Sequence, residues 1–241
     1  MNIPSSYSSK RGFTLVEIAL SLAIVAFALT AIIGVLPTGM TVQQDNREDT
    51  IINQDGLYIL EAIRSGSRGM DELTNYVEQI THIVQNGNNR RTNSLPTPSQ
   101  PLTGSNIVGL LTMPKISAAG TNFIFARMRS ITGSAVDRPI ANQPNDFGFR
   151  FQIQSEVTPV ISIPPELVND PMTLAMNLNI GENLHDVRLI VRWPLYERGN
   201  NWAVGRNRKV FRTQVGGKIV RSAGLNFFTP NQFTNAFAAN P

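Results

Sequence analysis

The feature that most limits what this chain can fold into is a long apolar segment close to its N-terminus. Residues 13–36 read FTLVEIALSLAIVAFALTAIIGVL and contain one ionisable side chain, that of Glu17. As an α-helix at ~1.5 Å per residue they extend ~36 Å, which is enough to cross the hydrocarbon core of a bilayer. Lys10 and Arg11 precede the segment, and positive residues on that side predict that the N-terminus stays in the cytoplasm.

Two ordinary interpretations of such a segment leave something unexplained. A secretory signal peptide has an apolar stretch of ~7–15 residues followed by a small-residue cleavage site, and this stretch is longer and lacks such a site. An uncleaved signal anchor accounts for the length and the flanking charges, but not for Glu17. A carboxylate in a membrane helix costs ~2.5–3.5 kcal/mol at the helix centre and less near the interface, so it is normally retained for a partner.

The residues at the start of the apolar segment favour a third interpretation. Residues 10–17, KRGFTLVE, followed directly by the apolar run, resemble the recognition sequence of type IV prepilins. The resemblance covers about residues 10–40 and is to the type IV pilins and the pseudopilins of type II secretion. It implies that residues 1–12 are a leader, that a prepilin peptidase cuts between Gly12 and Phe13, and that Phe13 becomes N-methylphenylalanine.

The same resemblance implies a role in assembly for Phe13 and Glu17. In the family, this carboxylate is thought to pair with the N-terminal amine of a neighbouring subunit in the apolar core of a filament. Leaving one partner of such a pair alone costs several kcal/mol, so the pair can set the axial register of the subunits. The implied partners are the prepilin peptidase, other pilin or pseudopilin subunits and the inner membrane.

Gly34 and Pro37 are expected to mark a helix break near the end of the apolar segment. Pro37 cannot donate a hydrogen bond to the carbonyl of Ile33, and its ring clashes with that turn. Gly34 makes a break easier. Two interpretations stay open: the membrane helix ends here, or the site is a soft joint that stretches when subunits pack.

Residues 37–85 continue with apolar residues at helical spacing, which predicts an outer helix followed by a short second helix. One stripe of the outer helix is expected to face the head: Ile52, Ile59 and Ile63, with Leu60 beside them. A second stripe predicts the short helix: Leu73, Val77, Ile80 and Val84. Residues 86–106 have the composition of an exposed loop.

Residues 107–222 are predicted to form a β-rich head, because apolar and polar side chains alternate along several stretches. The alternation is clearest in residues 147–157 and 184–193, and residues 121–131 are rich in β-formers.

The end of the head is predicted as a hairpin of residues 208–215 and 218–222, with Gly216-Gly217 as its turn. Residues 223–241 form a C-terminal tail for which packed and disordered states both stay open. The predicted fold class is therefore α+β: a long N-terminal transmembrane helix that continues into a head of a short helix and a mostly antiparallel sheet.

Residue types argue against an enzyme and against a metal site. The chain has no cysteine, which excludes disulfides, thiolate nucleophiles and Cys-based metal sites. The two histidines, His82 and His185, have no second histidine or spaced carboxylates near them in the sequence. No nucleophile elbow, P-loop, HExxH or dinucleotide-binding motif occurs. We therefore expect no catalytic residues, no cofactor and no metal.

One basic segment is a candidate binding surface. Residues 188–221 carry many basic side chains against Glu197 alone, with aromatic residues interleaved. Such a surface suits DNA or an acidic exported partner, but it also suits the solvated face of a hairpin whose basic side chains protect a sheet edge. The alternation favours the second interpretation, so nucleic acid is not an expected partner. The residues of the possible patch are Arg192, Arg198, Arg206, Arg208, Lys209 and Arg212.

The function that these features favour is structural. The mature chain is expected in the bacterial inner membrane, single-pass, with its N-terminus cytoplasmic and its head periplasmic, and then in a periplasmic or extracellular filament. The size of the head favours a minor subunit, whereas the choice between a pilus and a secretion system stays open. The alternative is a membrane-displayed binding module that uses the basic hairpin, residues 188–221, for DNA or an acidic partner.

Overall fold

The structure is a computed structural model that describes residues 12–132, 149–161, 170–199 and 201–234. The chain divides into two units, residues 1–49 and residues 50–241, and we call the second the head unit. Helix α1 (Leu15–Ser65) contributes to both units. Each part of α1 is therefore described with the unit to which it belongs.

The first unit contains the apolar part of α1 and the polar residues that follow it up to Asp49. Within the described residues, α1 is the one helix long and apolar enough to cross a membrane. The expected break at Gly34 and Pro37 does not end the helix, because α1 continues through Pro37 to Ser65. A proline removes one backbone hydrogen bond, and the turns on either side keep the helix continuous. The interpretation in which the membrane helix ends at Pro37 is wrong.

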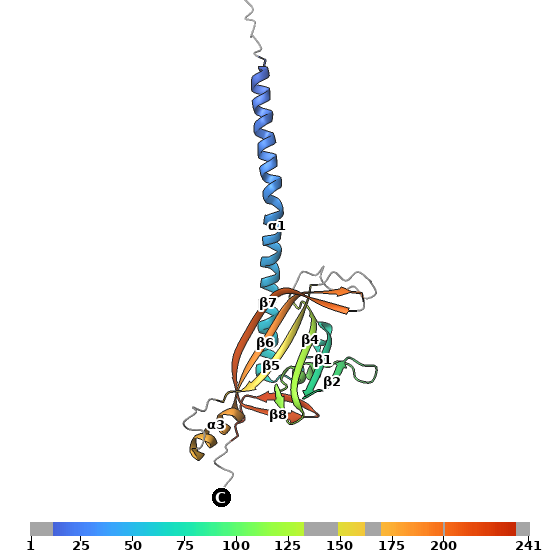
Figure 1. Ribbon diagram of the computed structural model, residues 1–241, viewed down its shortest axis with the longest axis vertical. Coiled ribbons are helices and arrows are strands. Elements are labelled where there is room, and N and C mark those ends of the chain that lie inside the picture. The colour runs from blue at the N-terminus through green and yellow to red at the C-terminus, as the bar shows by residue number, and fades with distance from the viewer. Residues whose placement is uncertain (1–11, 133–148, 162–169, 200, 235–241) are drawn as a thin grey trace, which may run out of the picture. The chain divides into compact units, whose positions relative to one another are not determined.

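The head unit is built on an antiparallel sheet with the strand order β2-β1-β4-β5-β6-β7 (Figure 1). Its strands are β1 (Val77–Asn86), β2 (Asn89–Leu95), β3 (Ile116–Ser117), β4 (Gly120–Arg129), β5 (Arg150–Pro159), β6 (Leu184–Arg198) and β7 (Asn201–Gly216). The short strand β3 lies outside this order and pairs with β4. A separate hairpin joins β8 (Lys218–Ser222) to β9 (Leu225–Thr229). The short helices are η1 (Asp71–Asn75), α2 (Gly104–Leu111) and α3 (Pro171–Asn183). The predicted α+β class is confirmed.

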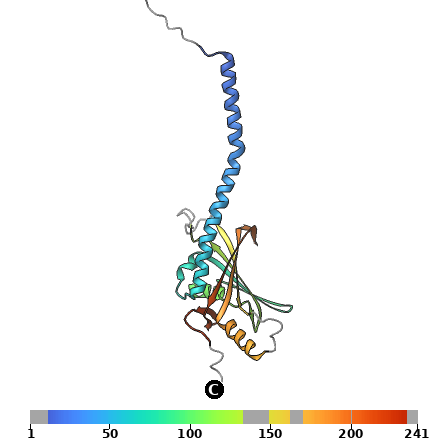
Figure 2. The same ribbon diagram turned by 90° about the vertical axis from the view of Figure 1, so that its left-hand side faces the viewer.

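The core of the head unit lies between one face of the sheet and the C-terminal part of α1 (Figures 1 and 2). The predicted stripe is buried, with Ile52, Ile59 and Ile63 at most 1% exposed. Gly56 allows the helix to lie close to β7, because a Cβ at this position would come 2.4 Å from the ring of Phe211. Apolar burial on this face is thus what attaches the helix to the sheet.

One carboxylate lies on this buried stripe. Asp55 is 0% exposed and accepts hydrogen bonds from the backbone N–H groups of Ile131 (2.9 Å) and Thr132 (3.0 Å) and from the Thr132 hydroxyl (2.8 Å). Burial raises the pKa of the Asp55 carboxyl above its ordinary value, although these bonds act in the opposite direction. Asp55 therefore ties α1 to the chain that leaves β4.

The short second helix predicted for residues 73–84 is wrong. Leu73 lies in the 3₁₀ turn η1, and residues 77–86 form β1, which pairs with both β2 and β4. The apolar spacing imitated a helix because the register shifts at a bulge between Val77 and Gln79. A bulge places an extra residue in one strand, so Val77 and Ile80 are both buried although they are three residues apart.

The expected loop at residues 86–106 and the expected tail also contain regular structure. The loop includes β2 and the first residues of α2. Residues 208–215 and 218–222 are strands, but they do not form one hairpin, because β7 pairs with β6 and β8 pairs with β9. The tail thus begins with β9, in which Phe227 and Phe228 are buried.

Helix α3 was not predicted from the sequence. Asp170 is its N-cap and accepts a hydrogen bond from the Thr173 backbone N–H (2.9 Å), and Pro171 occupies the first turn. An N-cap residue followed by proline is a recognisable start signal. In β5 the predicted alternation is confirmed for Phe151 and Ile153, whereas Phe147 lies outside the described residues.

Candidate functional site

The expected processing site lies in a non-helical stretch. Gly12, Phe13 and Thr14 precede the first residue of α1, Leu15. Phe13 is 85% exposed, and a side chain at Gly12 would meet no other atom within 4 Å. The peptide bond between Gly12 and Phe13 is therefore outside the helix and sterically open, as an enzyme that cuts it requires.

Thr14 and Glu17 form a reciprocal cap at the start of α1. The Thr14 backbone N–H and hydroxyl donate to Glu17 Oε2 (2.8 and 2.9 Å), and the Glu17 N–H donates to the Thr14 hydroxyl (3.3 Å). This is the capping box, in which a threonine and a glutamate three residues later satisfy each other's backbone groups. Sequence reasoning missed it, although the Thr-x-x-Glu spacing is its usual signal.

Among the described residues, the hydrogen bonds to the Glu17 carboxylate come from Thr14, whereas the Ser21 hydroxyl donates to the backbone carbonyl of Glu17 (2.7 Å). The apolar residues around Glu17 on α1 are exposed, among them Ile18, Leu20 and Ile24, which are more than half exposed. Both bonds from Thr14 go to Oε2. The capping box thus fixes the direction of the carboxylate within the single chain.

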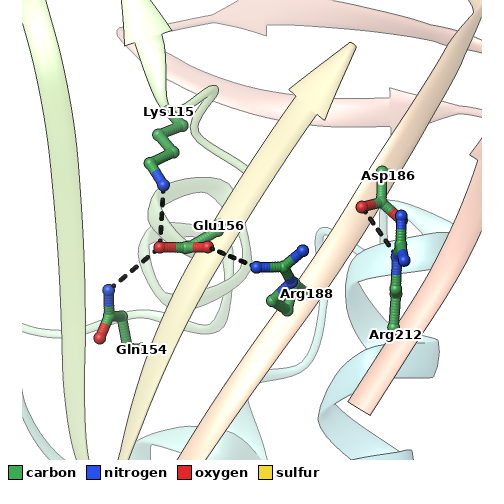
Figure 3. Close-up of polar contacts among 6 residues, drawn as sticks. All are labelled: Lys115, Gln154, Glu156, Asp186, Arg188 and Arg212. Carbon is green, nitrogen blue, oxygen red and sulfur yellow. Dashed lines mark hydrogen bonds and ion pairs between the residues drawn. The ribbon is translucent and has the colours of Figure 1, made fainter. Parts of the chain in front are cut away.

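The basic segment divides into paired and unpaired arginines. Figure 3 shows the paired group, in which Glu156 binds Lys115 (3.0 Å) and Arg188 (3.6 Å), and Asp186 binds Arg212 (2.7 Å). Among the residues of the possible patch, Arg212 therefore belongs to an internal ion pair.

The remaining patch residues do not share one face. Arg192 is opposite Arg208 in the β6–β7 register, whereas Lys209 is opposite the buried Val191 and so lies on the α1 side of the sheet. Arg198 is exposed at the tip of the hairpin, opposite Asn201.

A second arginine cluster, which the sequence did not indicate, anchors this tip. Glu78 contacts the Nε atoms of Arg127 (2.9 Å), Arg129 (2.6 Å) and Arg150 (2.8 Å). Burial alone would raise the pKa of Glu78, but the hydrogen bonds from Arg150 and Arg129 hold it below its ordinary value. Trp202 stacks on Arg127, with 4.2 Å from the guanidinium carbon to the ring centroid.

The histidines have structural surroundings. His82 Nε2 hydrogen-bonds to Asn122 Oδ1 (2.9 Å) across β1 and β4. His185 is buried against the ring of Phe228, at 5.4 Å between centroids, and burial lowers its pKa. In the part of the chain that the structure describes, no three His, Asp or Glu side chains come together as metal ligands.

Comparisons with known proteins identify the N-terminal segment. The family described as "Prokaryotic N-terminal methylation motif" matches residues 7–33. No curated protein and no solved structure matches the chain. The long apolar helix and this motif fit membrane anchoring, and the motif points to a structural protein. The chain carries the N-terminal methylation motif that is the hallmark of the type IV pilin and pseudopilin family.

Proposed function

We propose that this chain is the precursor of a structural subunit of a type IV pilus or a type II secretion pseudopilus. The observation that carries the proposal is the match of the methylation motif to residues 7–33, which covers the open Gly12–Phe13 bond and the capped start of α1. Prepilin peptidase cuts between Gly12 and Phe13, and the new N-terminal amine of Phe13 is methylated.

The processed chain enters the filament from the inner membrane. Lys10 and Arg11 hold the leader on the cytoplasmic side, so that the head unit lies in the periplasm. The apolar side chains of residues 13–36, which are exposed in the single chain, exchange lipid for neighbouring helices. The head unit has its own core in residues 50–241 and does not need this segment for its internal packing.

Glu17 directs assembly by pairing with the Phe13 amine of a neighbouring subunit. The capping box supports this role because it holds the carboxylate at the start of α1 before the partner arrives. An amine and a carboxylate that meet in an apolar filament core neutralise each other, and the loss of either leaves a buried charge. The large head unit supports the further proposal that the subunit is a minor one.

Substitution at Gly12 tests the processing step. Gly12→Val is expected to leave the full-length precursor in the membrane and to remove the protein from sheared filaments, while the fold stays intact because the position is open. Gly39→Val is the matched control, since Gly39 is another N-terminal glycine with nothing within 4 Å of its Cβ position. Normal cleavage of Gly12→Val, measured by the mass of the protein in membranes, would contradict the proposal.

A further inference from the structure

The outer face of β6 and β7 contains two pairs of arginines that oppose each other across the strands. Arg188 is opposite Arg212, and Arg192 is opposite Arg208. Directly opposed side chains of an antiparallel pair share a face, ~4.5–5.5 Å apart at Cβ, so that like charges destabilise the pair. Both pairs therefore place two positive charges opposite each other, but they differ in whether carboxylates lie beside them.

The first pair is neutralised within the head unit. Arg188 contacts Glu156 on β5, and the Arg212 Nε donates to both oxygens of Asp186, at 2.7 and 3.0 Å (Figure 3). Each arginine of the first pair therefore has a carboxylate on the strand next to its own, β5 for Arg188 and β6 for Arg212.

The second pair has no such compensation. The β5 residue opposite Arg192 is the neutral Gln152, and Arg208 lies on β7, the last strand in the sheet order. Arg206 lies two residues from Arg208, at the register shift between the Trp193–Asn207 and Leu195–Val204 pairs. All three side chains are exposed, and among the residues that the structure describes none of them forms an ion pair.

Protection of the sheet edge explains only part of this arrangement. Charged side chains on an edge strand discourage pairing with another chain, and Arg206, Arg208 and Arg212 serve this purpose on β7. Arg192 does not, because it lies one strand inward on β6. Its position opposite Arg208 adds repulsion without protecting an edge.

We propose that Arg192, Arg206 and Arg208 form a docking surface for an acidic polypeptide segment of another protein. Arginine forks bind carboxylates through paired, charge-assisted hydrogen bonds, and an acidic partner removes the repulsion that the fold leaves in place. Val210, which is 44% exposed on the same strand face, offers an apolar contact beside the charges.

The size of the surface favours a polypeptide over nucleic acid. Proteins that bind duplex DNA commonly contact about six to ten phosphates, whereas this surface has three unpaired arginines. Glu156 and Asp186 lie along the strands on one side of it, and Glu197 lies towards the hairpin tip on the other. On the β5 side, across Gln152, Arg127 already belongs to the cluster around Glu78, so the arginines without an ion pair match a short carboxylate-rich segment.

Binding of a labelled glutamate-rich peptide to the full chain in detergent, followed by fluorescence anisotropy, tests the proposal. Arg192→Gln/Arg208→Gln is expected to weaken binding ~10-fold or more at low salt. The matched control is Arg90→Gln/Arg91→Gln, which removes the same charge from two exposed arginines on β2, the opposite edge strand. It is expected to change affinity by less than ~2-fold, because distant charges are screened.

Three outcomes would overturn the proposal: no binding at low salt, equal losses in the two double variants, or tighter binding of duplex DNA with the same dependence on Arg192 and Arg208. The last outcome would assign the surface to nucleic acid instead. The unfolding temperature of each variant shows whether a loss of binding comes from misfolding. Arg192→Gln/Arg208→Gln is expected to unfold at the same or a higher temperature than the parent, because it removes a cross-strand repulsion.

Discussion

The two parts of helix α1 both contain apolar side chains and a carboxylate, but they differ in how these side chains are covered. In residues 15–36, apolar side chains are exposed along every face of the helix, whereas in residues 50–65 one stripe is buried under the sheet. Each part also has one notable carboxylate. Asp55 is buried and receives three hydrogen bonds from residues distant in the sequence, whereas Glu17 is bonded to Thr14, three residues away.

This difference separates folding from assembly along one helix. The second part is complete within the single chain, since its stripe and its carboxylate already have partners. The first part is not, because its apolar side chains are exposed in the single chain and, under the proposed function, Glu17 exchanges its local bonds to Thr14 for a pair with another subunit. Substitutions in the first part should therefore alter assembly without altering the stability of the head unit. Substitutions in the second part should lower the stability of the head unit.

The largest expected effect is at Glu17. Glu17→Ala is expected to abolish incorporation into filaments, because the Phe13 amine of the neighbour loses its partner in an apolar environment. Cleavage and the unfolding temperature of the head unit stay as in the parent. The measurement is quantitative blotting of sheared filaments against total membranes. Glu48→Ala, which removes another α1 carboxylate, is the control, and equal losses in the two variants would break the comparison.

The two apolar surfaces of α1 predict a contrast in stability. Ile59→Ala deletes a side chain that is 1% exposed, and a buried isoleucine truncated to alanine costs ~2–5 kcal/mol of unfolding free energy. Ile24→Ala deletes one that is 61% exposed and is expected to change that free energy by less than ~0.5 kcal/mol. Chemical denaturation followed by tryptophan fluorescence measures both, and similar values would contradict a core confined to the second part.

Substitution of Asp55 is expected to lower the unfolding free energy somewhat less than Ile59→Ala does. Asp55→Asn replaces a carboxylate oxygen by an NH₂ group that faces the N–H donors of Ile131 and Thr132. A buried donor left without an acceptor costs ~1–3 kcal/mol, and the denaturation midpoint should fall accordingly. Asp45→Asn changes an exposed α1 residue and serves as the control. An unchanged midpoint for Asp55→Asn would show that this carboxylate is not required to hold the helix.

The smallest predicted effect is a pH dependence from His185. Burial lowers its pKa below 6.5 in the folded chain, so the unfolded chain binds a proton more readily. The stability that His185 contributes is therefore complete above pH 6.5 and is lost as the pH falls through its folded value. His185→Leu should lose less stability than the parent on acidification. The measurement is the denaturation midpoint of the parent and of His185→Leu, each determined above and below pH 6.5.

The sequence predicted the parts of the fold that depend on one uniform pattern. The apolar segment is one continuous run, the buried stripe of Ile52, Ile59 and Ile63 follows the helical period, and the alternation in β5 follows the period of two. Residues 73–84 were misassigned because a bulge in β1 disrupts the period of two. Their β-branched residues, Val77, Ile80 and Ile83 among them, were the signal for a strand.

The candidate site was predictable only in part, because partners across the sheet cannot be located from one sequence. The Gly12–Glu17 segment is contiguous, so its motif can be identified directly. Arg188 and Arg212 are neutralised by Glu156 and Asp186. The strand register determines which acid lies beside which arginine. Asp55 had a weaker signal: an acid three residues after Ile52 and four before Ile59 lies on the apolar stripe and requires a polar partner.

Mass spectrometry of the intact protein and of its N-terminal peptide, after isolation from native membranes, tests the central claim most directly. The account predicts a chain that begins at Phe13 and carries one added methyl group on its N-terminal amine. A chain that retains residues 1–12 in cells that contain an active prepilin peptidase would contradict it, and the match at residues 7–33 would then belong to an ordinary membrane anchor.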